Sequence, residues 1–334
     1  MTYSLSLLDK SPILEGENAM VALQRTTSLV QAAECLGYRR FWLAEHHDFP
    51  GLASPAPEVL AAHLLARTEH IRIGTGGVLL PHYSPYKVAE IFNLLASLAP
   101  GRVDLGIGKA PGGLPLATEA LRRLHDPARA PSFETLLGEL DGFLAPPSDQ
   151  PGVPERARAF PVPPATPERF LLGASPDSAR QAGERGWHFV FAGHHNGDPT
   201  AIEVSLNAYA KAGGTAPLLL AVAAFAAETA EEALGLTENH RVVRLTLDDG
   251  QNLNLGSEEQ AAEYARQAGA ASYRTEIRKP HILAGTPGQV RRELDALHAR
   301  FGIAEFVIDT PVALTARRLA SVTLLAERTP ALAA

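Results

Sequence analysis

Short apolar runs alternate along the chain with longer stretches in which apolar residues recur at helical spacing. The runs have the length and the β-branched and aromatic content of buried strands, and short links join them to the helical stretches. They cover residues 3–8, 41–44, 71–75, 102–107, 170–172, 187–191, 218–225 and 306–308. Strands that alternate with helices in this way are typical of a parallel sheet with both faces covered.

The helical stretches carry their own start and stop signals. Between residues 88 and 95 the apolar side chains stand at i, i+3, i+4 and i+7, which puts them on one helix face. A serine followed by a proline, a good cap and first helical position, begins the stretches at residues 54, 84 and 175. The expected helices cover residues 18–36, 54–67, 84–99, 175–185, 258–267, 286–300 and 313–326.

A doubly wound sheet and a closed barrel share this pattern. The length of 334 residues and the functional-looking residues at several strand ends favour an α/β fold of the (β/α)8 TIM-barrel type. We expect one domain, residues 1–334, with insertions at approximately 114–167 and 235–280. The proline-rich segment 146–167 is predicted to lack regular structure, and the second insertion is predicted to be polar with one helix.

Composition narrows the possible partners. The net charge is −7 and Lys and Arg form no dense run, which argues against nucleic acid and anionic membranes as partners. The longest apolar run, residues 217–227, is too short to span a bilayer, and we expect no signal peptide. The one cysteine, Cys35, excludes an internal disulfide. We therefore expect a cytoplasmic protein.

Titratable residues follow the second strand directly. The apolar run at residues 41–44 stops at Glu45, His46 and His47. The carboxyl ends of parallel strands are where α/β folds carry their chemistry, and imidazole titrates near neutral pH. We therefore predict Glu45, His46 and His47 as catalytic residues, with His46 as the acid or base and its neighbours orienting it.

Other strand ends carry features suited to a flat, phosphorylated ligand. Ser175 and Ser178 stand at a helix start, where free backbone N–H groups favour an anion, although the carboxylate of Asp177 opposes one there. Lys109 lies in a glycine-rich turn that lacks the spacing of a nucleotide-binding loop, and its charge could neutralise a monophosphate. At Gly76-Gly77 no side chain would block a flat ligand from the backbone.

These segments together resemble the successive motifs of the bacterial luciferase-like flavin monooxygenases, in the branch without light emission. The likeness is carried by residues 42–47 (WLAEHH), 74–81 with Ser84-Pro85, 101–102 with 106–112 (GIGKAPG), and 171–175 with Ser178 and Arg185-Gly186. The order and spacing of these motifs make the resemblance specific over residues 3–200.

The resemblance implies an eight-stranded barrel that uses reduced FMN and dioxygen, with FMN reduced by a separate NAD(P)H-dependent flavin reductase. It implies that His46 faces the flavin ring, and that a cis peptide at Gly76-Gly77 lies beneath that ring. The phosphate ligands would be Lys109, Ala174, Ser175 and Ser178, and Gly76, Gly77 and Gly108 would also bind the cofactor. A homodimer and a mobile lid at residues 235–280 are also expected from the family.

The substrate would be a small organic molecule, and the pocket residues expected from strand-end position are His82, His194 and His195. Gly108 stands where the light-emitting subunit has a reactive cysteine, which argues against light emission. Lys109 replaces a more usual arginine and gives up bidentate phosphate contact.

Three alternatives stay open. A deazaflavin-dependent dehydrogenase would use the same fold, and a non-catalytic flavin-binding protein would use the same site. A metal-dependent hydrolase could bind metal through His46 and His47. Adjacent residues of an extended strand point to opposite faces, so we expect no metal.

Overall fold

Eight parallel strands close into a barrel. The computed structural model describes residues 3–124, 126, 129–145, 157–194 and 197–326. The barrel strands are β1 (Ser4–Asp9), β2 (Arg40–Leu43), β3 (Arg72–Thr75), β5 (Val103–Gly108), β6 (Glu168–Gly173), β7 (His188–Ala192), β8 (Leu219–Ala226) and β13 (Glu305–Asp309). They pair in this order, and pairing of β7 with β8 and of β13 with β1 closes the ring of eight strands. The predicted (β/α)8 barrel is thus confirmed.

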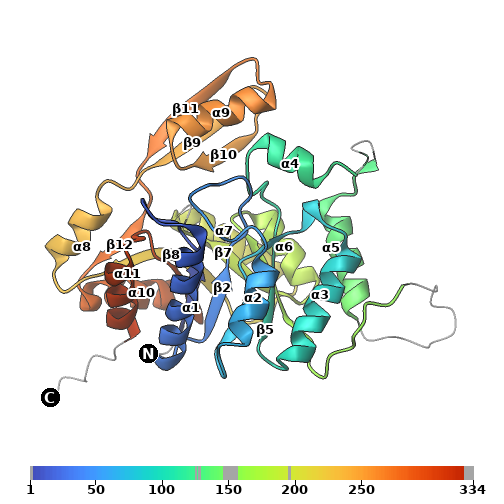
Figure 1. The fold of residues 1–334 in the computed structure, drawn as a ribbon, viewed down its shortest axis with the longest axis horizontal. Helices are drawn as coiled ribbons and strands as arrows, with labels where there is room; N and C mark the ends of the chain where they lie inside the picture. The colour runs from blue at the N-terminus through green and yellow to red at the C-terminus, as the bar shows by residue number, and fades with distance from the viewer. Residues whose placement is uncertain (1–2, 125, 127–128, 146–156, 195–196, 327–334) are drawn as a thin grey trace.

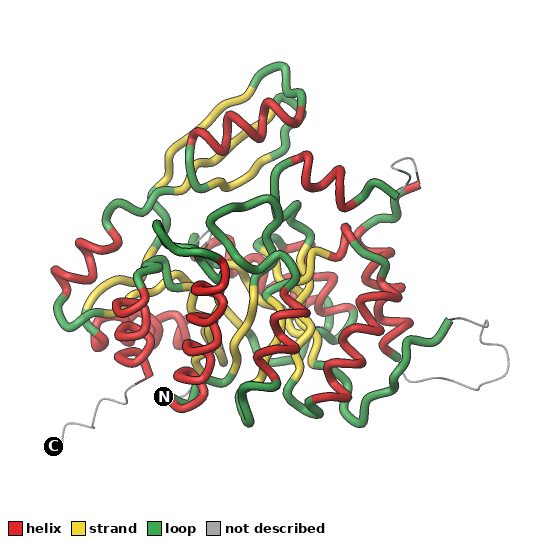
Figure 2. The backbone as a smooth tube through the Cα atoms, in the orientation of Figure 1, coloured by secondary structure: helices red, strands yellow, loops and turns green. Residues whose placement is uncertain are grey.

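Helices cover the outside of the barrel (Figure 1, Figure 2). The outer helices are α1 (Ala19–Cys35), α2 (Pro57–Leu65), α3 (Pro85–Leu98), α5 (Phe133–Leu144), α6 (Pro176–Glu184), α7 (Pro199–Lys211), α10 (Pro287–Phe301) and α11 (Thr315–Ala326). Short additional elements are β4 (Val78–Leu79), the 3-10 turn η1 (Leu80–His82), α4 (Pro115–Leu121), α8 (Ala230–Thr237) and β12 (Ile282–Gly285). β12 extends the barrel by pairing with the carboxyl half of β8.

The strands are buried on both faces, as the apolar runs predicted. In β2 the Phe41 and Leu43 side chains belong to the layer between strands and helices, whereas Trp42 points into the barrel. There the Trp42 indole packs against Phe170, with ring centroids 4.9 Å apart, and beside Leu8. Continuous apolar runs are therefore required, because neither face of these strands meets water.

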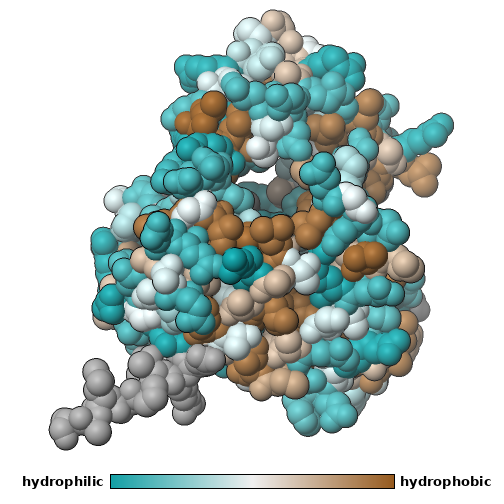
Figure 3. All heavy atoms as spheres, turned by 60° about the vertical axis from the view of Figure 1, so that its left-hand side comes forward, coloured by the Kyte–Doolittle hydropathy of each residue, from teal (hydrophilic) through white to brown (hydrophobic). Residues whose placement is uncertain are grey.

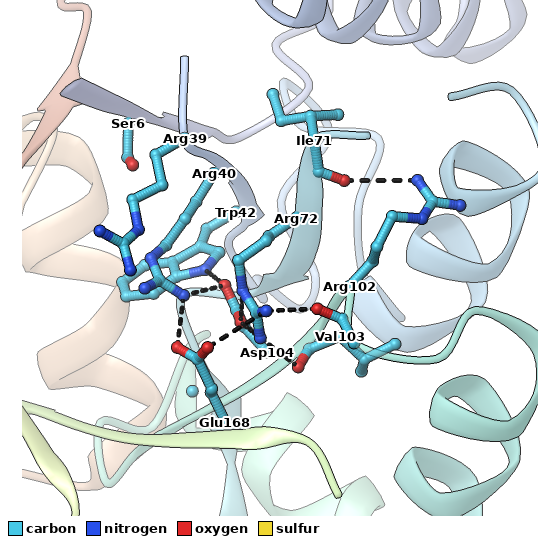
Figure 4. A network of polar contacts seen from close by, with 12 residues as sticks. Ser6, Arg39, Arg40, Trp42, Ile71, Arg72, Arg102, Val103, Asp104 and Glu168 are labelled. Carbon is cyan, nitrogen blue, oxygen red and sulfur yellow. Dashed lines mark hydrogen bonds and ion pairs between the residues drawn. The ribbon is translucent and has the colours of Figure 1, made fainter. Parts of the chain in front are cut away.

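The amino end of the barrel is closed by charged residues that contact one another (Figure 4). Arg40 Nη1 lies 2.9 Å from both Asp104 Oδ2 and Glu168 Oε2, and Arg40 Nε lies 2.9 Å from Glu305 Oε1. Arg72 Nη2 lies 2.6 Å from Asp104 Oδ1. These residues stand first or second in their strands, so parallel pairing brings them to the same level.

A small antiparallel sheet covers the opposite, carboxyl end (Figure 1). It consists of β9 (Val242–Leu247), β10 (Asn252–Leu255) and β11 (Tyr273–Arg278), with α9 (Glu258–Ala268) packed on it. The backbone N–H of Leu116 in α4 donates to Gln267 Oε1 at 3.0 Å, which joins the two insertions across the barrel mouth. The helix predicted at residues 258–267 is confirmed, whereas the three strands were not predicted.

One helix start was predicted wrongly. The helix expected from Ser54 begins at Pro57 instead, after Ala56. Ser54 is buried in the loop before it, where its carbonyl oxygen accepts the backbone N–H of His46 at 3.3 Å. The serine thus holds the loop after β2. Its hydroxyl does not cap the helix. The helices expected from Ser84 and Ser175 begin as predicted, at Pro85 and Pro176.

Candidate active site

Glu45 joins three segments at the carboxyl end of the barrel. Its side chain is fully buried, and its Oε1 accepts the Tyr83 hydroxyl at 2.8 Å and lies 2.7 Å from His47 Nε2. Its Oε2 accepts the backbone N–H of Leu79 at 3.1 Å. Burial first, and then the negative charge of Glu45, raise the pKa of Tyr83, so this hydroxyl keeps its proton as the donor. Glu45 therefore fixes the loop that carries His46 and His47.

His46 follows Glu45 and is half buried at the mouth. Its ring centroid lies 6.4 Å from that of Phe49, with the two planes inclined at 62°. In the same loop, the Ala53 backbone N–H donates to Ser11 of the loop after β1 at 3.0 Å. The segment from His46 to Ser54 is consequently tied to the neighbouring strand end.

Gly76 and Gly77 are joined by a cis peptide bond, as the resemblance led us to expect. A Cβ atom on Gly77 would lie 2.7 Å from the Gly106 carbonyl oxygen, and one on Gly76 would lie 2.8 Å from Leu8 Cδ1. A larger residue would collide at either position. The backbone here is closely packed against Leu8 and Gly106, and neither glycine has a side chain that could block a flat ligand.

The loop after β5 lies beside the His46 loop. The His47 backbone N–H donates to the Gly112 carbonyl at 2.8 Å, and Gly108 pairs with Leu79. Lys109 in this loop is 47% exposed, and its Nζ lies 3.8 Å from Asp177 Oδ2. Lys109 therefore reaches the start of α6, the predicted anion site.

Ser175 caps α6. Its Oγ accepts the backbone N–H of Ser178 at 3.3 Å, and the two hydroxyl oxygens lie 3.1 Å apart. Ala174 precedes the cap on an exposed turn. The carboxylate of Asp177 bonds outward to Arg180 at 2.9 Å and to Gln181 at 2.8 Å. The hydrogen bond from Arg180 lowers the pKa of Asp177, which stays charged beside Lys109.

A cavity of about 330 Å³ lies between the barrel mouth and the β9–β11 sheet. Figure 3 shows the surface hollowed between the two. Its polar lining residues are Lys10, His194, His240, Arg241, Asn254, Asp309, Thr310 and Arg318. His194 was predicted here, whereas two residues were missed: Lys10, which directly follows β1, and Arg241, which directly precedes the unpredicted strand β9. The predicted His195 lies outside the described residues.

His82 does not line this cavity. Its Nε2 lies 2.9 Å from the Pro111 carbonyl oxygen, and Arg122 Nε donates to its Nδ1 at 3.1 Å. Burial is the main cause that lowers the pKa of His82, and the charge of Arg122 adds to it. His82 is thus a neutral side chain that links α4 to the loop of Lys109.

Two further features concern metals and membranes. Within the described residues, no group of three or more His, Cys, Asp or Glu side chains is arranged to hold a metal ion. None of the helices in that part of the chain combines the length and the apolar character that crossing a membrane requires.

The predicted residues therefore converge from four strand ends onto one end of the barrel. Comparison with known proteins identifies the family that shares this arrangement, because the model for "luciferase-like monooxygenase" matches residues 1–304. The chain belongs to the luciferase-like monooxygenase family. The resemblance inferred from the motifs is confirmed, and with it the expectation of an oxidoreductase of the monooxygenase type.

Relatives extend over nearly the whole chain. The N-acetyl-S-alkylcysteine monooxygenase of Bacillus subtilis (strain 168) is 43% identical over 329 residues, 97% of each protein. The solved structure of apo-MsnO8 is 30% identical, with a TM-score of 0.75 over 97% of each chain. The oxygenating constituent of 3,6-diketocamphane monooxygenase from Pseudomonas putida, in complex with FMN, is 20% identical, with a TM-score of 0.69 over 98% of this chain and 97% of that one. At that identity the likeness concerns the fold alone.

Proposed function

We propose that this protein is an FMN-dependent monooxygenase that oxygenates a small organic substrate and receives reduced FMN from a separate NAD(P)H-dependent flavin reductase. The observation that carries the proposal is the meeting of Lys109 with the start of α6, at the same barrel end as cis Gly76-Gly77 and His46. One side of this mouth suits a phosphate, and the other suits a flat ring.

The residues present fit FMN. Lys109 and the hydroxyls of Ser175 and Ser178 would hold the phosphate at the amino end of α6, where the helix dipole favours an anion. Ala174 and Gly108 have at most a methyl side chain, so FMN could approach the backbone at both positions. The backbone of Gly76 and Gly77 would support the ring. It is closely packed, because a Cβ atom at either glycine would lie less than 3.0 Å from other atoms of the protein.

When bound, reduced FMN supplies the two electrons with which dioxygen gives one oxygen atom to the substrate and the other to water. The protein must move protons during this chemistry. The imidazole of His46 is the candidate carrier, because it is half exposed at the mouth and an imidazole can both accept and donate a proton.

Glu45 and His47 would act by positioning. Glu45 is buried and satisfied by His47, Tyr83 and the Leu79 N–H, so it orients the loop and does not reach the substrate. His47 is held by this carboxylate and, through its backbone, by Gly112. The pair thereby fixes the direction in which His46 leaves β2.

For the substrate we propose an N-acetyl-S-alkylcysteine. The support is the full-length relative at 43% identity whose name states this substrate. The cavity of about 330 Å³ has the size of a small-molecule site.

The test is rapid mixing of the protein and reduced FMN with oxygen, with and without N-acetyl-S-ethylcysteine. We expect flavin oxidation at a rate different from that of free flavin, and oxygen-18 from labelled dioxygen in the product. His46→Ala should slow product formation at least about tenfold, the low end for acid–base catalysis. His63→Ala, on the exposed face of α2, should leave it unchanged.

Other outcomes would identify the alternatives. Tight binding of a deazaflavin instead of FMN, with turnover independent of oxygen, would indicate a dehydrogenase. FMN binding with oxidation kinetics that no substrate alters would indicate a non-catalytic flavin-binding protein.

We also propose that the enzyme acts in the cytoplasm as a homodimer, on the strength of family likeness. Sedimentation of the purified protein at micromolar concentration would reveal a single species of the monomer's mass if the dimer is wrong.

A further inference from the structure

The cavity beneath the β9–β11 sheet has one charge that no carboxylate of the described residues compensates. Of its three cationic side chains, Lys10 pairs with Asp309 at 2.7 Å and Arg318 pairs with Asp9 at 2.6 Å. Arg241 instead donates to backbone carbonyl oxygens, that of Glu238 and that of His240, the latter at 2.9 Å. Among the described residues, no carboxylate lies within ion-pair distance of Arg241.

Burial is the main cause that lowers the pKa of His240, and Lys10 lowers it further, so His240 adds no charge near neutral pH. Arg318 is 6% exposed, and its Nε has no acceptor in the described part of the chain. The cavity therefore presents hydrogen-bond donors and one cation, Arg241, without an ion-pair partner among the described residues.

The remaining walls are apolar. They include Leu52, Ala223, Val242, Leu255, Pro280 and Ile282. A ligand that fills this space needs an apolar body and a single anionic group. A monoanion matches one uncompensated cation, whereas a phosphate monoester would carry a second charge with no partner.

The cavity adjoins the loop of His46. Leu52 in its wall pairs with Pro12, and Ser54 of the same loop accepts the His46 backbone N–H at 3.3 Å. A molecule anchored at Arg241 would therefore extend along a wall that continues to the proposed reaction site.

We propose that the cavity binds a carboxylate-bearing substrate, with Arg241 as the counter-ion of the carboxylate and the apolar wall against the rest of the molecule. This inference rests on the proposed function for the site, and it names the cavity and the residue that would bind the carboxylate of that substrate. A planar guanidinium at the open edge of the cavity can bind both oxygens of a carboxylate.

The experiment compares N-acetyl-S-ethylcysteine with its neutral methyl ester. Each is titrated calorimetrically into the protein, alone and saturated with oxidised FMN, so that binding is measured without turnover. We expect the acid to bind at least about tenfold more tightly than the ester, as for a charge-assisted contact.

Three variants sharpen the result. Arg241→Gln should weaken binding of the acid at least about tenfold and leave the ester unchanged, while Arg241→Lys should restore part of the loss. Arg278→Gln is the matched control, because Arg278 lies in β11 of the same insertion and pairs with Glu276 at 2.6 Å, outside the cavity. The Arg278→Gln variant should bind the acid with the same affinity as the unaltered chain.

Equal affinity for acid and ester, equal losses in the Arg241 and Arg278 variants, or no binding of either ligand would overturn the inference. The proposed function fails separately. If the acid binds through Arg241 but no labelled oxygen enters it, the binding site stands and the oxygenation does not. If acid and ester are oxygenated equally well, the oxygenation stands and the carboxylate site does not.

Discussion

The two ends of the barrel use charged residues in opposite ways. At the amino end Arg40 is 1% exposed and contacts three carboxylates at 2.9 Å (Figure 4). At the carboxyl end Lys109 is 47% exposed and its nearest carboxylate partner, Asp177, lies at 3.8 Å. Charges that are saturated by the protein stabilise the fold, whereas charges left at the mouth are available to a ligand.

The electrostatics of the amino end support this reading. Burial opposes the charge of Arg40, but Asp104, Glu305 and Glu168 outweigh it and hold the pKa of Arg40 above its usual value. Burial likewise opposes the charge of Glu168, and Arg40 and Arg72 reverse that effect and lower its pKa. Each charge is tolerated only because its partners are present.

The largest effect is expected from Arg40→Leu. It would leave buried Glu305 without its closest cation and buried Asp104 with Arg72 alone, and removing one partner of a buried pair costs about 3–5 kcal/mol. Urea and thermal unfolding should therefore detect a strongly destabilised protein.

The neighbouring arginine is the matched control for this change. Arg39 also lies near Glu305, at 3.5 Å, but its side chain is 51% exposed. Arg39→Leu should cost less than about 1 kcal/mol, as for a surface ion pair. Similar losses in the two variants would mean that burial does not distinguish the charges at this end.

A mouth charge should show the reverse behaviour. Lys109→Met should change the free energy of unfolding by less than about 0.5 kcal/mol, since the side chain is half exposed. It should weaken FMN binding by about 10- to 100-fold, the value of a hydrogen bond to a charged group. Fluorescence titration would measure the affinity for FMN and for riboflavin. Riboflavin lacks the phosphate, so its affinity should not change.

The control for Lys109 is Lys87→Met. Lys87 is an exposed lysine of α3 that pairs with Glu90 at 3.2 Å. Equal losses of FMN and riboflavin affinity in Lys109→Met would place the phosphate elsewhere.

A smaller effect of opposite sign is expected at Asp177. Its carboxylate shares Lys109 with any incoming phosphate, so Asp177→Asn should tighten FMN binding by about 1.5- to 5-fold, in line with an exposed ion pair. The effect should vanish at high salt. Glu184→Gln, which removes another ion-pair partner of Arg180 at the far end of α6, should leave the affinity unchanged. Weaker binding in Asp177→Asn would mean that this carboxylate supports the site.

Sequence reasoning predicted the features that short-range patterns determine. The eight barrel strands follow from apolar runs, and the cap at Ser175 follows from one serine and one proline. Placing His46, Lys109 and Ser175 on one rim required only that parallel strands end on the same side.

What was missed depends on contacts between distant segments. β9 and β11 carry alternating polar residues that the composition of the insertion concealed, and their pairing involves residues far apart in sequence. Tyr83 was missed because its role depends on Glu45, which is distant in sequence. Arg241 was missed because the β9–β11 sheet, which covers the barrel mouth, was not predicted. Ser54 was wrongly predicted to cap a helix. The Ser-Pro pattern is a local signal for a cap, but the Ser54 carbonyl oxygen accepts the His46 backbone N–H, and this contact holds Ser54 in the loop.

The smallest expected effect concerns pH and tests whether the mouth also contains saturated groups. His82 has both ring nitrogens engaged, and its pKa lies below its usual value chiefly because of burial. The unfolded chain then binds the proton more readily. The contribution of His82 to stability is accordingly full above about pH 6.5 and is lost as the pH falls from there through the lower pKa of the folded state. Urea unfolding at pH 7.5 and 5.5 measures how far the free energy of unfolding falls on acidification. This fall should be smaller in His82→Gln than in the unaltered chain, and it should not be reduced in the exposed His63→Gln. If His82→Gln loses as much stability on acidification as the unaltered chain, His82 can be protonated in the folded protein. His82 would then belong with the available groups of the mouth, such as Lys109, and not with the fully paired groups, such as Arg40.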